Sequence, residues 1–214
     1  MNWPASWYAP DCKRCPRIAA NLAAVRVTHP DYHAGPVPPF GDRSARLLVV
    51  GLGPGMHGAN RTGRPFTGDH AGIMLYEVLF DSGFASASAS TAPDDGLRLD
   101  ACRITNAVKC LPPGNKPTGA EVRECNGYLA AELAALAAGS VILALGRVAH
   151  EAILRAFGER LAAYRFAHGA EHTVAGHTLL DSYHCSRYNT NTGRLTRDMF
   201  AAVMTRAAAR VHDG

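Results

Sequence analysis

The chain has 214 residues, of which 47% are hydrophobic and 19% are charged, and its formal net charge is +4. A chain of this length and composition can bury a substantial core, which argues against global disorder and favours one domain over residues 1–214. No apolar run reaches the roughly 20 residues that cross a bilayer, and residues 1–4 do not begin a secretory signal, so we expect a cytoplasmic protein without a membrane partner.

The first half of the chain alternates between regular elements and loops rich in Gly and Pro. A helix is predicted from about 17 to 27, and an extended loop over 28–42 follows it. Residues 47–51 form a short apolar run that is typical of a strand buried on both faces. The next helix is predicted over about 71–82, and we expect 85–96 to be an exposed and mobile connection.

The second half repeats this alternation, with three further strands and three further helices. The predicted strands are 103–108, 141–146 and 178–183, and the predicted helices are 118–138, 147–157 and 196–211. Thr118 followed by Glu121 has the form of a capping box, which marks the start of the first of these helices. Strands that alternate with helices predict a single three-layer α/β/α domain around a mainly parallel, four-stranded sheet.

The loop over 51–69 is unusual because six of its nineteen residues are Gly. Glycine lets the backbone approach a bound group closely. The loop lacks the third Gly of the dinucleotide fingerprint and the Gly-Lys-Ser/Thr ending of a phosphate-binding loop. A structural connection is one interpretation, but loops of this length are uncommon unless they are functional. This loop, 106–117 and 184–194 all leave predicted strand ends, where parallel sheets form ligand sites.

The loop after the last predicted strand carries several polar and cationic side chains. His184 directly follows the strand, and a neutral His there can donate a hydrogen bond to a developing oxyanion. Side chains of the kind that grip a phosphodiester backbone follow it, namely Ser186, Arg187, Asn189 and Arg194. Of the 22 basic residues 19 are Arg, which suits phosphate binding, although a genome rich in G and C would give the same bias. The alternative is a solvated surface loop.

Four of the six cysteines have a spacing that suggests metal ligation. Cys12-x-x-Cys15 lies near the N-terminus, and Cys110 and Cys125 flank the second loop. Four thiolates suit either a closed zinc site or an iron–sulfur cluster. The alternative is a core Cys125 with an unrelated Cys12 and Cys15 pair. The remaining two cysteines have no partner by spacing and are expected to be ordinary buried or half-exposed thiols, Cys102 and Cys185.

This combination of motifs resembles the uracil-DNA glycosylase superfamily, and within it the iron–sulfur, broad-specificity family 5. Its first signature is matched by Gly51-Leu-Gly-Pro-Gly55 together with residues 60–69, and its second by residues 184–194. Residues 105–110 match the motif between them. The chain departs from the family pattern in Cys185, where the family usually has Pro, and in Gly53, where Ala is common.

The resemblance implies both an activity and a cofactor. It implies a DNA glycosylase that removes uracil, and other deaminated bases such as hypoxanthine, from DNA in base-excision repair. We expect the enzyme to be monofunctional and monomeric. It also implies that Cys12, Cys15, Cys110 and Cys125 hold a 4Fe-4S cluster, which ties residues 1–16 to the rest of the domain. No Lys in these loops is placed as a Schiff-base nucleophile, so we expect an abasic product and no strand cleavage.

The chemistry of base release assigns a role to four side chains. Asp69 would stabilise the oxocarbenium-like sugar and orient water, and its alternative role is the N-cap of the following helix. His184 would donate a hydrogen bond to O2 of the departing base, and one such donor stabilises the transition state by about 3 kcal/mol. Phe66 would stack on the flipped ring and Asn106 would read the base edge, unless they are ordinary core and strand-end residues. The other expected substrate contacts are Gly53, Pro54, Gly55, Asn60, Ser186, Asn189 and Arg194.

Two other function classes stay open at this point. One is a non-catalytic iron–sulfur protein that binds nucleic acid, and the other is a hydrolase of free nucleosides or nucleotides. A binder would not require Asp69 and His184 on separate strand-end loops, so their coincidence favours the enzyme. The candidate phosphate contacts are Arg14, Arg61, Arg64, Arg187 and Arg194.

Overall fold

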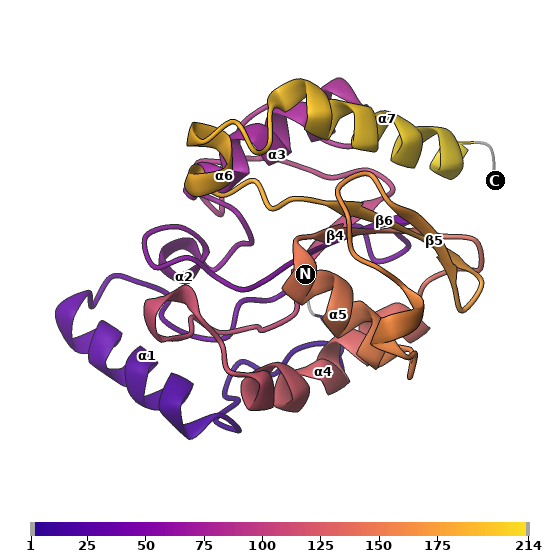
Figure 1. Ribbon diagram of the computed structural model, residues 1–214. Helices are drawn as coiled ribbons and strands as arrows, with labels where there is room; N and C mark the ends of the chain where they lie inside the picture. Colours follow the sequence, from indigo (N-terminus) through magenta and orange to yellow (C-terminus); the bar gives the residue numbers. More distant parts are fainter. Residues whose placement is uncertain (1–2, 213–214) are drawn as a thin grey trace.

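One six-stranded sheet organises the chain between residues 3 and 212, the part that the computed structural model describes (Figure 1). The strands are β1 (Phe40–Gly41), β2 (Leu47–Gly51), β3 (Cys102–Asn106), β4 (Val141–Leu145), β5 (Glu171–Val174) and β6 (His177–Ser182). They lie in the order β1-β3-β2-β4-β6-β5. The four inner strands are parallel, whereas β1 and β5 pair antiparallel with β3 and β6 at the two edges.

The prediction of four strands is therefore wrong in number, although the four predicted strands are the parallel centre of the sheet. The edge strands lack the apolar runs that identify the others. β1 is only two residues long and lies in a Pro-rich loop. β5 is exposed or half-buried at three of its four residues, so its sequence, Glu-His-Thr-Val, has only one buried apolar residue, Val174.

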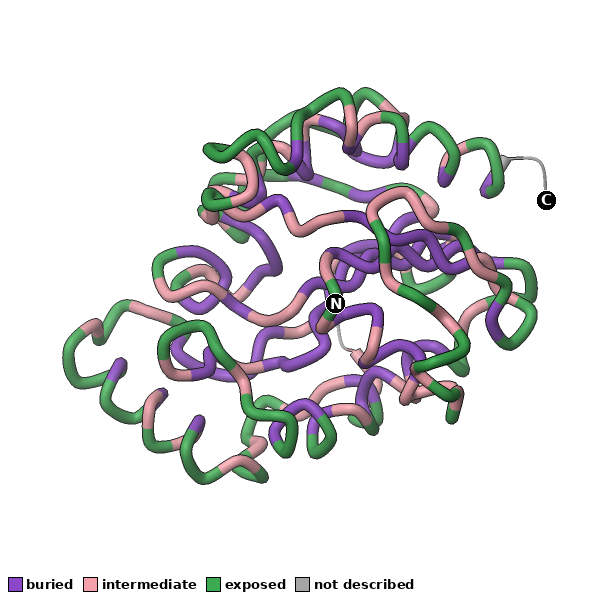
Figure 2. The backbone as a smooth tube through the Cα atoms, in the orientation of Figure 1, coloured by how far each residue is buried: buried purple, intermediate pink, exposed green. Residues whose placement is uncertain are grey.

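Helices cover both faces of this sheet. The α-helices are α1 (Pro16–Thr28), α2 (Ala59–Thr62), α3 (His70–Asp81), α4 (Gly119–Ala134), α5 (Arg147–Ala156), α6 (Arg187–Asn191) and α7 (Arg197–His212). Helices α3 and α7 lie on one face, and α4 and α5, with α1 beside them, lie on the other (Figure 1). Figure 2 shows the buried strands between helices whose outward sides are exposed. Within the described residues, no helix is both long and apolar enough to traverse a bilayer.

Strand β2 illustrates why the sequence folds this way. All five of its residues are buried, because each face of the strand packs against a helical layer. Leu47 and Val49 belong to the core under α3 and α7, whereas Leu48 and Val50 belong to the core under α4 and α5. This alternation follows from the two-residue period of a strand. The parallel strands end at a common edge, and there the loops discussed below meet.

Two local predictions can be compared directly with the structure. The capping box at the start of α4 is confirmed, because Thr118 Oγ1 accepts from the Glu121 backbone N–H and the Glu121 carboxylate accepts from the Thr118 N–H. The connection over 85–96 is exposed for most of its length, as predicted. Its Asp95 is nevertheless anchored by an ion pair to the Arg64 guanidinium, at 2.5 Å.

Candidate active site

The glycine-rich loop closes around the carboxylate of Asp69. This residue directly precedes α3, yet its side chain makes no capping hydrogen bond to that helix. Its Oδ2 instead accepts from the Ala59 backbone N–H at 3.0 Å. A Cβ at Gly55 would lie 2.3 Å from Asp69 Oδ1, and a Cβ at Gly58 would lie 1.9 Å from its Cγ. The side-chain N-cap interpretation is therefore wrong, and these glycines are needed so that the loop can surround the carboxylate.

The environment of Asp69 makes its carboxylate a better proton acceptor than a free one. Burial raises the pKa of Asp69, although the Ala59 N–H and the nearby Arg61 and His57 act in the opposite direction. Burial raises an acid's pKa because it disfavours the charged form. A carboxylate of this kind suits a role beside a developing cation and a reacting water.

Phe66 and Asn106 converge at the end of β2. Phe66 adopts a positive φ of 57°, a strained conformation for a side chain of this size. A Cβ at Gly51 would lie 2.5 Å from Asn106 Oδ1 and 2.7 Å from the Phe66 ring. Only glycine at this position lets both side chains approach the strand end. The Phe66 ring also stacks beside the His184 imidazole, with 5.9 Å between the ring centroids.

His184 is held at the end of β6 by the loop that follows it. Its backbone carbonyl accepts from Asn189 Nδ2 at 2.9 Å, and Ser186 caps the short helix α6. Burial lowers the pKa of His184 from 6.5 to about 4. The imidazole is therefore neutral near pH 7 and carries one N–H donor, as the sequence predicts for this position.

These side chains face a single pocket. The cavity has a volume of about 540 Å3, within the range of small-molecule sites. The predicted site residues that line it are Gly53, Gly55, Phe66, Asp69, Asn106, His184 and Ser186. Two proposed catalytic residues that are 115 positions apart in sequence thus share one cavity with an aromatic ring and an amide.

Four predicted substrate contacts do not line this pocket. Pro54 and Asn60 are buried within the glycine-rich loop, and the Asn60 side chain is fully enclosed. Asn189 and Arg194 line an adjoining groove that also borders His184. The Arg194 guanidinium lies over the Tyr183 ring, 4.5 Å from its centroid.

The structure adds residues that the sequence analysis missed. Arg147 lines both the pocket and the groove, Arg165 lines the groove, and Asn115 and His70 line the pocket. Arg147 directly follows Gly146 at the end of a predicted strand, so the strand-end rule could have identified it. His70 Nε2 also forms a 3.0 Å hydrogen bond with Thr190 Oγ1, which joins the first loop to the last.

One predicted phosphate contact is wrong. Arg64 is 5% exposed, and its guanidinium binds Asp95, Ser90 and Thr67 while it stacks on the Phe40 ring. It anchors the surface connection and cannot reach a DNA backbone. The other four candidates are exposed, namely Arg14, Arg61, Arg187 and Arg194.

The four predicted ligand cysteines meet although the two pairs are distant in sequence. Cys12, Cys15, Cys110 and Cys125 line one small cavity on the α1 and α4 side of the sheet. Burial and the neighbouring thiols raise the pKa of Cys15 to about 11 and that of Cys110 to about 12. The Lys109 backbone N–H donates to Cys125 Sγ at 3.3 Å, a contact typical of metal-bound thiolates. The remaining two cysteines are buried, as predicted, namely Cys102 and Cys185.

The chemistry of this donor set fits a metal group. Four thiols from two distant parts of the chain line one cavity, and four thiolates are the ligands that either a zinc ion or an iron–sulfur cluster takes.

A buried ion network supports the cysteine cavity. Glu132 accepts from Lys109 Nζ at 2.5 Å and lies 3.6 Å from Arg103 Nε. The Arg103 guanidinium in turn stacks over the Trp7 ring, 4.4 Å from its centroid. The network therefore connects the N-terminal segment to β3 and α4. It also occupies Lys109, the buried lysine beside Cys110.

Comparison with known proteins places this arrangement in context. Residues 38–208 match the family model described as the uracil DNA glycosylase superfamily. The chain is 48% identical over 202 residues to the type-5 uracil-DNA glycosylase of Thermus thermophilus, covering 92% of both chains. It is 43% identical to the type-5 enzyme of Pyrobaculum aerophilum, covering 98% of this chain and 96% of the relative. The type-5 enzyme of Mycobacterium bovis is 40% identical over 92% of this chain and 76% of its own length.

Proposed function

Because the chain belongs to the uracil-DNA glycosylase superfamily, and within it to the type-5 uracil-DNA glycosylases, we propose that it hydrolyses the N-glycosidic bond of uracil in DNA. It is a monofunctional, monomeric enzyme of base-excision repair that leaves an abasic site. One observation carries this proposal for the chain itself: Asp69 and His184 line one pocket with Phe66 and Asn106.

The pocket receives a nucleotide that has been flipped out of the duplex. Flipping costs a few kcal/mol, and stacking of the base on the Phe66 ring offsets part of this. Asn106 Oδ1 is buried and has no hydrogen-bond partner among the described residues. It can therefore accept from the N3–H of uracil or the N1–H of hypoxanthine. Cytosine and adenine carry acceptors at these positions, so the amide selects deaminated bases and leaves the normal ones unpaired.

Cleavage separates charge, and the two proposed catalytic groups stabilise its two ends. As the C1′–N bond breaks, its electron pair leaves with the base, and the neutral imidazole of His184 donates to the oxygen on which negative charge develops. The Asp69 carboxylate stabilises the positive sugar. A water then attacks C1′, and Asp69 accepts its proton.

Release of free base tests this function directly. The purified protein should release uracil from a uracil-containing duplex and leave the strand intact until alkali is added. A protein that binds this DNA and releases nothing would instead be a nucleic-acid binder. Strand cleavage without alkali would contradict the monofunctional mechanism.

We also propose that Cys12, Cys15, Cys110 and Cys125 hold a 4Fe-4S cluster, which supports the fold. Cys12 and Cys15 lie within residues 1–16, whereas Cys110 follows β3 and Cys125 lies on α4. The cluster would therefore tie the N-terminal segment to the rest of the chain and make residues 1–214 one domain. Cys12→Ser should lower the iron and sulfide content and the thermal stability. A full cluster in that variant would contradict the ligand set.

DNA binding is assigned to the groove beside His184. Its exposed cations are Arg147, Arg165 and Arg194, which lie where the strand that flanks the flipped nucleotide would pass. Arginine suits bidentate contacts to phosphate. Binding should therefore weaken as the salt concentration rises, because neutralised phosphates release counterions.

A further inference from the structure

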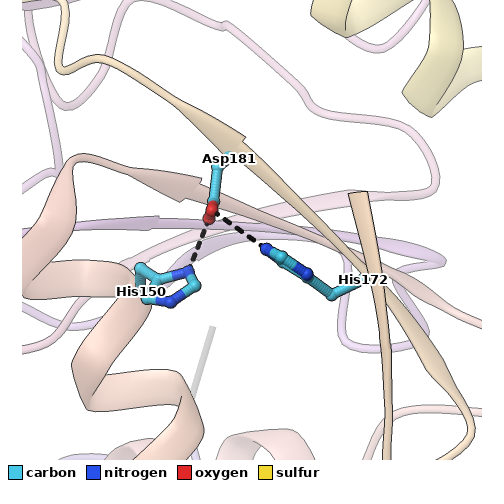
Figure 3. Close-up of side chains that lie close together, drawn as sticks. All are labelled: His150, His172 and Asp181. Atoms are coloured by element: carbon cyan, nitrogen blue, oxygen red, sulfur yellow. Dashed lines mark hydrogen bonds and ion pairs between the residues drawn. The ribbon is translucent and has the colours of Figure 1, made fainter. Parts of the chain in front are cut away.

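A second group of metal-type ligands lies away from both the base pocket and the cysteine cavity. It consists of His150 on α5, His172 on β5 and Asp181 on β6. In Figure 3, the two imidazoles approach the Asp181 carboxylate from different sides. His150 Nδ1 lies 2.8 Å from Asp181 Oδ1, and His172 Nε2 lies 3.5 Å from Asp181 Oδ2. His150 and Asp181 are buried, and His172 is half-buried.

The pairing of β5 with β6 and the packing of α5 bring these three side chains together. His172 stands opposite Leu179 in the antiparallel β5–β6 pair. Because side chains alternate along a strand, His172, Leu179 and Asp181 project from the same face. Leu179 packs in the core beneath α5, so this is the face that α5 covers. His150 reaches the group from that helix.

Two buried polar atoms of this group have no hydrogen-bond partner among the described residues. His150 Nε2 lies 3.0 Å from the Tyr164 carbonyl oxygen, which can only accept, so Nε2 must carry a proton. His150 Nδ1 lies at hydrogen-bond distance from Asp181 Oδ1, so this contact needs either a second proton on the ring or a cation between the two atoms. Asp181 Oδ2 and His172 Nε2 are both buried and have no hydrogen-bond partner among the described residues. A positive centre among these atoms would satisfy all of them at once.

We propose that His150, His172 and Asp181 bind a divalent transition-metal ion of the zinc class. Bonds of 2.0–2.2 Å in a tetrahedral site separate ligand atoms by about 3.4 Å. His172 Nε2 and Asp181 Oδ2 lie 3.5 Å apart, and one ligand atom from each of the three residues lies within 4.8 Å of the others. The 2.8 Å between His150 Nδ1 and Asp181 Oδ1 is a hydrogen-bond distance, which a bound ion would lengthen. Two imidazoles and one carboxylate are ligands that zinc accepts, with a fourth position left for water. The Tyr164 carbonyl is the outer contact that fixes the tautomer of a metal-bound histidine.

This site lies close in sequence to His184, which lines the base pocket. Asp181 precedes His184 by three residues on the same segment, at the end of β6. An ion held by α5, β5 and β6 would fix the strand end from which His184 projects. Because thiolates also bind zinc, the iron content of the cysteine cavity must be measured together with zinc binding.

The test measures metal content and not base release. The protein with its iron–sulfur cluster is dialysed against EDTA, then equilibrated with micromolar free zinc, and its zinc and iron are measured. We expect one zinc per chain in the wild type, and zinc should raise its unfolding midpoint. His172→Asn should weaken zinc binding at least about 10-fold, the loss that even an outer contact to a metal site produces. The iron content should not change, which would show that zinc has not entered the cysteine cavity.

His177→Asn is the matched control, because His177 lies on the same hairpin and outside the group. It should bind zinc as the wild type does. The proposal is overturned if the wild type binds no zinc, or if His172→Asn binds it as tightly as the wild type. In that case the group is a protonated His150 paired with Asp181, and no metal is involved.

Discussion

The base pocket and the cysteine cavity are both assembled from distant parts of the chain, but they treat buried polar groups differently. In the pocket, Asn106 Oδ1 has no partner and burial keeps His184 neutral. Beside the cysteine cavity, Glu132 lies between Lys109 and Arg103, so buried charges are paired within the protein. The pocket therefore keeps hydrogen-bonding capacity for a substrate, whereas the other region uses its charges to hold the fold.

If that contrast is correct, the largest loss of stability follows from removing the central charge of the paired region. Glu132→Ala leaves the buried charges of Lys109 and Arg103 without a carboxylate partner, and we expect the free energy of unfolding to fall by about 3–5 kcal/mol. Urea denaturation measures this. Glu124→Ala is the control, because Glu124 is exposed on the same helix and should change stability by about 0.5 kcal/mol or less. Equal losses in both variants would contradict the paired-charge account.

In the pocket, the rate of base release should instead depend on where the Asp69 carboxylate is placed. Gly58→Ala places a Cβ against the Asp69 carboxylate and must displace it. Because a misplacement of about 1 Å can cost about 100-fold in rate, we expect a fall of that order in base release. Gly127→Ala is the control, since Gly127 lies on α4 with no atom near the added Cβ. Unchanged release by Gly58→Ala would show that the loop does not position Asp69.

The neutral His184 predicts a specific dependence of stability on pH. Its pKa is 6.5 in an unfolded chain and about 4 in the folded protein. Between these values only the unfolded chain binds the proton, so the free energy of unfolding falls as pH falls from 6.5 towards 4. At pH 5 this contribution is about 2 kcal/mol. His184→Asn should therefore lose less stability than the wild type between pH 7 and pH 5, measured by urea denaturation. Equal losses would contradict the buried neutral imidazole.

The smallest effect is expected at the rim of the pocket. Arg165→Ala removes one exposed cation from the groove. The affinity for DNA should fall modestly for every sequence, and the slope of log affinity against log salt should decrease by about 1. Fluorescence anisotropy over a range of salt concentrations measures both. Arg64→Ala should leave that slope unchanged, because Arg64 is bound to Asp95.

Sequence patterns predicted the centre of the fold and missed its edges for a physical reason. An apolar run such as residues 47–51 is required wherever a strand is covered on both faces, so it appears in the sequence. An edge strand such as β5 needs no such run, and its pairing depends on backbone hydrogen bonds that any residue can make. The strands that position the site were therefore predictable and the edge strands were not.

The same limit explains which site residues were predicted. Asp69 and His184 lie in loops that leave β2 and β6 at the same edge of the sheet, where the topology brings loops together. The direction of a side chain is not encoded locally, so the sequence could not decide whether Asp69 capped α3 or faced the loop. Arg64 was misassigned because its partner, Asp95, is 31 residues away and only the folded chain brings them together.

Single-turnover release of uracil by Asp69→Asn and His184→Asn tests the central claim most directly. Asp69→Asn keeps the shape of the side chain and removes its charge, whereas His184→Asn replaces the imidazole ring with a smaller amide. The account predicts that each slows release by at least about 100-fold, while the iron content and the unfolding midpoint at pH 7 stay close to those of the wild type. Release at the wild-type rate by both variants would contradict a shared pocket in which these two residues act on one base.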